Sequence, residues 1–164
     1  MKKVQLILLS QFMLQITFAQ KTDFTGNWSI DTSKSDFGSA PLFVVPAEIS
    51  VQQTADSLFL SVVNIDDKGS KSTASAKYPL NGNAIEKEFQ TDVKLIGSLQ
   101  WTADQNHLAK SQRFINAAQS EDPFRKVKEM WSLSNDGRYL TIEQSVEIAD
   151  ADGYAVKAVY EKKW

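Results

Sequence analysis

The stretch KVKEMWSLSNDGRYLTIEQSVE, residues 126–147, contains two runs of alternating side chains separated by a short polar segment. A spacing of two places successive side chains on opposite faces of a β-strand. The polar segment contains Asn135, Asp136 and Gly137, residue types that tolerate the left-handed backbone of a tight turn. The stretch therefore predicts an antiparallel hairpin with one face on a core and the other in water. The face that we assign to the core carries Val127, Glu129, Trp131, Leu133, Leu140, Ile142, Gln144 and Val146.

The same alternation continues through most of the chain, and no stretch sustains a helical period. Further turn signals rich in Asn, Asp and Gly recur at 66–69, 81–83, 104–106 and 150–153. These signals divide the chain into nine or ten expected strands, at 24–30, 47–53, 57–64, 71–79, 84–90, 93–103, 107–115, 124–133, 138–147 and 154–161.

Sequential hairpins are typical of an up-and-down meander, and closing the meander into a barrel removes its unpaired edges. We therefore predict an all-β fold, an antiparallel up-and-down β-barrel of about 8–10 strands. A two-sheet sandwich with Greek-key crossovers is the alternative, although most connections are too short for such crossovers. The one long connection, 31–46, is expected to shape the mouth of the barrel.

The composition narrows the classes of function. The chain has 164 residues, enough for one globular domain, which we place at 20–164. It has no Cys, which excludes disulfides and cysteine nucleophiles, and a single His, which excludes a histidine-rich metal site. A formal net charge of −2 argues against nucleic acid as a partner. We expect no metal and no cofactor.

Residues 1–19 have the organisation of a secretory signal peptide. Lys2 and Lys3 form a positive start, an apolar region follows, and Thr17-Phe18-Ala19 resembles a small-x-small cleavage site. The apolar region is shorter than the roughly 20 residues that a membrane span needs. We therefore expect cleavage after Ala19 and export as a soluble, periplasmic or secreted protein whose mature form has no membrane span. A buried N-terminal helix is the alternative.

The start of the predicted barrel carries a short motif, FTGNW at 24–28, followed by KSDFG at 34–38. Together with EMWSLSNDGR at 129–138 and LTI at 140–142, it resembles a group of exported bacterial lipocalin-like, calycin-type β-barrel domains. The resemblance implies that Trp28 plugs the closed end of the barrel. It implies that Lys157 or Lys162, on the last strand, covers this Trp. It also implies the binding of a small molecule, but no reaction.

Three tryptophans lie on the inward parity of their strands, namely Trp28, Trp101 and Trp131. They are expected to line or plug the interior, where an aromatic lining would suit an apolar or planar ligand. The alternative is that they fill a small barrel and leave little cavity.

Glu129 also lies on an inward face, where a carboxylate is costly unless it is paired or hydrogen-bonded. Gln144 on the next strand and Lys110 and Gln112 on the preceding strand share this inward parity. We interpret Glu129, Gln144 and Gln112 as residues that orient the polar group of a ligand. The alternative is an internal ion pair between Glu129 and Lys110 or Arg113 that fixes the strand register.

A basic stripe of Arg125, Lys126 and Lys128 is expected on the outward face of the same strand. Glu143 and Glu147 on the next strand would pair with it across the sheet surface. The stripe is therefore interpreted as a solvated face rather than a binding site.

Catalysis has little support in the sequence. Glu129 and Glu143 have opposite parity, which excludes a carboxylate pair, and His107 follows a turn, where it is expected to be exposed. We therefore predict a binding protein for a small, largely apolar ligand. One alternative is a protein-interaction module, such as an envelope-enzyme inhibitor or assembly partner, with a filled barrel and an apolar patch at 42–45. A second alternative is an isomerase- or hydratase-type enzyme that uses Glu129 as a base.

Overall fold

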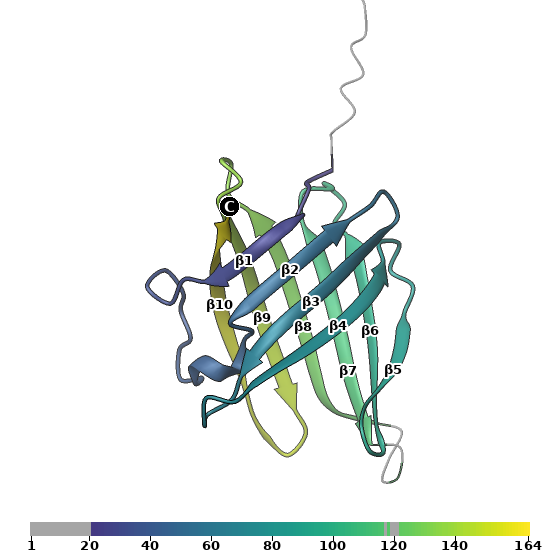
Figure 1. Ribbon diagram of the computed structural model, residues 1–164. Helices are drawn as coiled ribbons and strands as arrows, with labels where there is room; N and C mark the ends of the chain where they lie inside the picture. The colour runs from purple at the N-terminus through teal and green to yellow at the C-terminus, as the bar shows by residue number, and fades with distance from the viewer. Residues whose placement is uncertain (1–20, 117, 119–121) are drawn as a thin grey trace, which may run out of the picture.

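The computed structural model describes residues 21–116, 118 and 122–164 (Figure 1). The expected signal peptide, 1–19, lies outside these residues. Ten antiparallel strands follow one another along the described chain: β1 (Gly26–Ile30), β2 (Glu48–Gln53), β3 (Ser57–Ile65), β4 (Lys71–Pro79), β5 (Ile85–Gln90), β6 (Val93–Trp101), β7 (Leu108–Asn116), β8 (Pro123–Leu133), β9 (Tyr139–Ile148) and β10 (Ala151–Lys163). They form one sheet in the order β4-β3-β2-β1-β10-β9-β8-β7-β6-β5.

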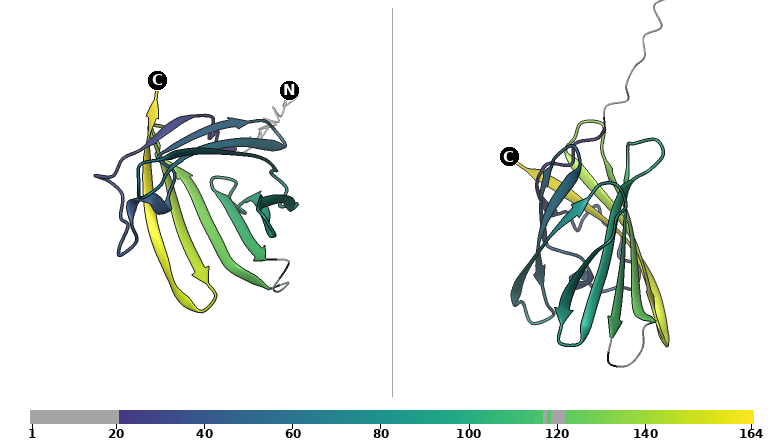
Figure 2. Two further views of the ribbon diagram at one scale, coloured as in Figure 1. Left: turned by 60° about the horizontal axis from the view of Figure 1, so that its bottom comes forward. Right: turned by 90° about the vertical axis from the view of Figure 1, so that its right-hand side faces the viewer.

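This order confirms the predicted barrel, because the first strand pairs with both its neighbour β2 and the last strand β10. The sheet curls round so that its two ends, β4 and β5, approach each other (Figures 1 and 2). Side chains close much of the remaining gap. The Tyr78 ring on β4 lies so close to Gly97 on β6 that an added Cβ there would be 3.0 Å from it. Asn81 also forms a β-bridge with Gln100.

The hairpin of residues 126–147 has the predicted form. Glu129 pairs with Gln144 and Trp131 with Ile142 across β8 and β9. Gly137 takes a left-handed φ of 67°, and the Asp136 carboxylate accepts a hydrogen bond from the Arg138 backbone N–H at 3.1 Å. The Asn-Asp-Gly segment therefore makes the tight turn for which its residue types are suited.

The last strand differs from the prediction at its start. β10 begins at Ala151 rather than 154, because the turn is confined to Ala149 and Asp150, and Asp150 takes a left-handed φ of 60°. The register shifts between Ala151 and Tyr154, which marks a β-bulge. Gly153 lies in this bulge, where a Cβ would meet the Val146 carbonyl oxygen at 2.4 Å. The glycine that indicated a turn therefore permits a close strand approach instead.

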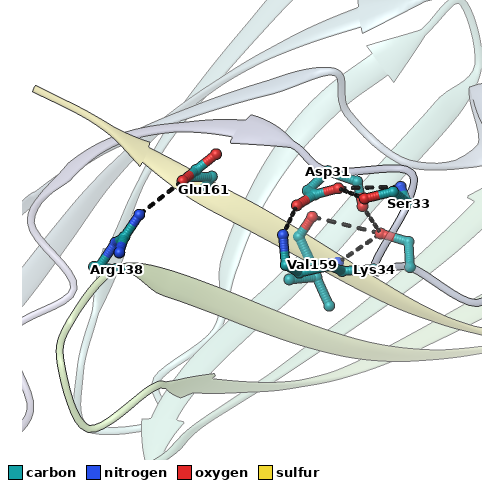
Figure 3. A network of polar contacts seen from close by, with 7 residues as sticks. Asp31, Ser33, Lys34, Arg138, Val159 and Glu161 are labelled. Atoms are coloured by element: carbon teal, nitrogen blue, oxygen red, sulfur yellow. Dashed lines mark hydrogen bonds and ion pairs between the residues drawn. The ribbon is translucent and has the colours of Figure 1, made fainter.

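The first residues of the long connection 31–46 are hydrogen-bonded to β10 (Figure 3). The Asp31 N–H donates to the Val159 carbonyl at 2.8 Å, and the Ser35 hydroxyl accepts from the Val159 N–H at 2.9 Å. Hydrogen bonds from Lys34 and Ser33 lower the pKa of the Asp31 carboxyl to about 2. Further along, Asp36 forms a bridge with Lys157, and a short 3₁₀ helix, η1 (Leu42–Val44), precedes β2. The connection is therefore held against β10 by hydrogen bonds and contains a helical turn of its own.

The core is concentrated toward one end of the barrel. Large, fully buried side chains gather there, including Phe24, Trp28, Leu58, Leu108, Trp131, Leu140 and Tyr160. A smaller cluster of Leu95, Phe114, Val127 and Val146 lies on the wall formed by β6 to β9. The hairpins β3–β4 and β9–β10 lie at the lower end of the barrel in Figure 1, away from β1. One end of the barrel is thus packed, while the interior beyond it is left for a cavity.

Candidate ligand-binding site

A cavity of about 560 Å³ occupies the barrel interior between η1, β3, β4 and β5 on one side and β6 to β10 on the other. Most of its wall is apolar, contributed by Leu60, Val62, Ala74, Ala76, Leu95, Phe114, Val127 and Ile148. Several lining residues are exposed, among them Phe43 of η1, Asp66 of the β3–β4 turn, Ser72 of β4 and Phe89 of β5. The cavity therefore opens to solvent at the end opposite the packed core, and connection 31–46 contributes to its mouth as predicted.

A buried ion pair forms part of the cavity wall. Lys110 Nζ lies 2.9 Å from Glu129 Oε1, and the two side chains are only 9% and 8% exposed. The second carboxylate oxygen, Oε2, accepts a hydrogen bond from Trp131 Nε1 at 2.7 Å, and Gln144 Nε2 donates to Oε1 at 3.4 Å. Lys110, and not the exposed Arg113, is thus the partner of Glu129. The inward Glu129 is held by three donors.

The two glutamines of the expected site differ in their surroundings. Gln144 is buried in the cavity wall, and its Oε1 is covered and has no hydrogen-bond partner among the described residues. Gln112 on β7 is half-buried, and its Nε2 donates to the hydroxyl of Tyr78 on β4 at 3.4 Å. Burial raises the pKa of the Tyr78 hydroxyl. Gln112 therefore also helps to hold the barrel closed.

The tryptophans lie away from the large cavity. Trp28 is buried in the packed end, donates from Nε1 to the Phe24 carbonyl at 3.2 Å, and has Lys162 Nζ 5.3 Å above its ring. Lys162 is thus the basic residue of the last strand that covers Trp28. Trp101 is half-buried with its ring 6.0 Å from that of Phe24. Trp131 borders a separate void of about 30 Å³. The three tryptophans thus pack at the filled end of the barrel, as expected of a plug. That they line a ligand site remains a prediction.

Arg125 lies in the cavity wall and not on the outer face, where we expected it with Lys126 and Lys128. It shares the parity of Val127 and Glu129, so its side chain points into the barrel and lines the cavity. Only Lys126 and Lys128 form the outward stripe, and each lies within ion-pair distance of Glu147, at 3.8 and 3.4 Å. The expected stripe combined residues of both faces. The period of two already contained the signal that separates them.

A second hollow, of about 750 Å³, lies on the outer face of β6 to β10. Its lining includes small side chains, namely Ser98, Ala109, Ser111, Ser145 and Ala155. Its walls are the outer face of β6 to β10 and, at one side, Asp36 and Gly38 of the connection 31–46. The interior cavity is instead enclosed by strands from both sides of the barrel. The interior cavity is therefore the better candidate for a small-molecule site.

The remaining chemical candidates are separated by the fold. Glu143 pairs in register with Met130 and lies on the outer face, so it cannot work with Glu129. His107 Nδ1 lies 3.2 Å from Asp104 in the β6–β7 turn, outside the cavity. Within residues 21–116, 118 and 122–164 there is no cluster of three or more His, Asp or Glu side chains suited to a metal ion. The same residues contain no helix with the length and apolar character needed to cross a membrane.

Comparison with known proteins agrees with the barrel fold. No family model and no curated protein matches the chain. Among solved structures, the zebrafish ileal bile acid-binding protein, crystallised with cholic acid, is similar with a TM-score of 0.50 and 14% sequence identity. The match covers 85% of this chain and 98% of that one. This similarity shows the fold alone, a nearly closed, ten-stranded antiparallel barrel.

Proposed function

We propose that this protein is exported and binds a small, largely apolar molecule non-covalently inside its barrel. The observation that carries the proposal is the interior cavity of about 560 Å³ with an apolar wall and an open mouth. Sites for small molecules are concave, mostly apolar and roughly 300–1,000 Å³ in volume, with a few placed polar groups. The similar barrel of the bile acid-binding protein, which holds cholic acid in its crystal, supports the same use of the fold.

The polar groups of the cavity favour binding over catalysis. A general base needs a free carboxylate within reach of the substrate proton. Glu129 is instead engaged by Lys110, Trp131 and Gln144, all through its two carboxylate oxygens. The isomerase- or hydratase-type alternative therefore lacks an available base. Gln144, a neutral amide in the cavity wall, is proposed to orient a polar group of the ligand.

The protein-interaction alternative rests on the apolar segment 42–45. Leu42 and Phe43 are indeed exposed, by 61% and 49%, but Val45 is buried. That alternative also expects a filled barrel, and the interior cavity argues against it. Phe43 also lines the cavity mouth, so its exposure is explained by the same site.

We expect the protein to bind Nile red, a neutral apolar dye whose fluorescence rises in apolar surroundings, with one molecule per chain. Burying the dye removes its apolar surface from water, which favours binding in proportion to the area buried. A fluorescence titration measures the affinity and the stoichiometry. A fluorescence rise that does not saturate, or that needs several dyes per chain, would indicate surface adsorption and argue against an interior site.

A further inference from the structure

Arg125 is a cation in the cavity wall, and no described residue is its anionic partner. In the described part of the chain its guanidinium forms no ion pair. Its Nη2 donates to the Tyr154 hydroxyl at 3.1 Å, and the guanidinium carbon lies 5.3 Å from the centre of the Phe114 ring. Its Nε is covered by protein atoms and has no hydrogen-bond partner among the described residues. The guanidinium therefore carries a charge in the cavity wall that no described carboxylate neutralises, and a charge drawn away from water is costly unless it is paired.

The residues next to Arg125 in the cavity wall do not supply an anion for its guanidinium. In the strand register it lies between Phe114 on β7 and Ile148 on β9, both apolar. The cavity wall contains two carboxylates, and both have donors of their own. Glu129 is held by Lys110, and Asp66 accepts hydrogen bonds from backbone N–H groups of its own turn. Neither carboxylate of the cavity wall is therefore free to pair with Arg125.

We propose that the ligand of the cavity is an amphipathic organic acid whose carboxylate binds Arg125 and Tyr154. This inference rests on the proposed function and specifies the chemical class of the ligand. A guanidinium presents its N–H groups in a planar fork that matches a carboxylate. The Tyr154 hydroxyl accepts from Arg125 and keeps its own proton to donate to the second carboxylate oxygen.

The position of Arg125 sets the orientation of the ligand. Arg125 lies near the start of β8 and pairs with Ile148 beside the β9–β10 hairpin, at the open end of the barrel. The carboxylate would thus stay near water, where its desolvation costs less than at the packed end. The apolar part would extend along Val127 and Leu60 into the interior, away from the open end.

The test compares dodecanoate with dodecanol, which share the apolar chain and differ in the charged group. Each is titrated as a competitor of Nile red, at a pH at which the acid is ionised. We expect the wild-type protein to bind the acid at least about tenfold more tightly than the alcohol, as hydrogen bonds to a charged group predict. This comparison needs no variant.

The substitution Arg125→Gln removes the charge and keeps a polar side chain. We expect it to bring the two affinities within about twofold of each other, while affinity for dodecanol is retained. Lys126→Gln is the matched control, because Lys126 is adjacent in sequence but lies on the outer face. It should retain the preference for the acid.

The outcomes separate the two proposals. If Nile red and dodecanol bind but the wild-type protein shows no preference for the acid, the carboxylate site is wrong and the proposed function stands. A preference that survives Arg125→Gln would also overturn the assignment to Arg125. If neither dye nor amphiphile binds, both proposals fail.

Discussion

The substitution Ala76→Trp is expected to abolish Nile red binding, with a loss of affinity of roughly a hundredfold or more. Ala76 lies on β4 and lines the interior cavity, so the largest side chain placed there projects into the space that the ligand needs. The cavity of about 560 Å³ offers room for the new ring. The protein should therefore fold while losing its ligand. The fluorescence titration measures the loss.

The matched control is Lys77→Trp, the same new side chain at the next residue of the same strand. Lys77 is exposed, so this variant adds an aromatic surface without entering the barrel. It should bind Nile red with wild-type affinity. Equal binding by both variants, with circular dichroism showing that both are folded, would mean that the dye does not occupy the interior. Ala74→Trp, also on the cavity wall, replaces Ala76→Trp if the latter fails to fold.

The substitution Lys110→Met is expected to lower the free energy of unfolding by about 3–5 kcal/mol. It leaves the Glu129 carboxylate without its counter-ion in a site where that side chain is only 8% exposed. Trp131 and Gln144 still donate to the carboxylate, but neither carries a charge. The double variant Lys110→Met with Glu129→Gln removes the uncompensated charge. It should recover most of the lost stability. Chemical denaturation measures both.

Lys128→Met is the control for the buried pair. Lys128 lies 3.4 Å from Glu147 on the outer face, and the two side chains are 69% and 56% exposed. Exposed pairs contribute about 0–1 kcal/mol, so this variant should scarcely change stability. If Lys110→Met costs no more than Lys128→Met, the Lys110–Glu129 pair is solvated. The interior would then be wetter than its burial indicates.

The sheet could be predicted closely because its pattern is local. The alternation through residues 126–147 identified β8 and β9 and the faces of Glu129 and Gln144, which the structure pairs directly. Each strand begins and ends within a few residues of its predicted bounds, except at the bulge that starts β10. A bulge depends on the partner strand, here on the Val146 carbonyl beside Gly153, and such a contact leaves no period in the sequence.

The site could be predicted only in part. Parity shows which face a side chain occupies but not its height along the barrel. Trp28 and Glu129 both point inward, yet one lies in the packed end and the other at the cavity. The inward position of Arg125 could be predicted from its parity with Val127 and Glu129. It was instead grouped with Lys126 and Lys128 because all three are basic and close in sequence. Whether the interior is open depends on how side chains from distant strands fill it. The sequence pattern of a single strand does not show how much of the interior these side chains fill together.

Native mass spectrometry of the protein purified from its own cells tests the central claim most directly. If a small molecule occupies the barrel after export, the spectrum will show a chain that begins at Gln20 with a discrete added mass that disappears on denaturation. The fragmented ligand should be a largely apolar molecule, and an acid if Arg125 binds it. A bare chain that takes up neither Nile red nor dodecanoate would contradict the account, and an uncleaved chain would contradict the proposed export.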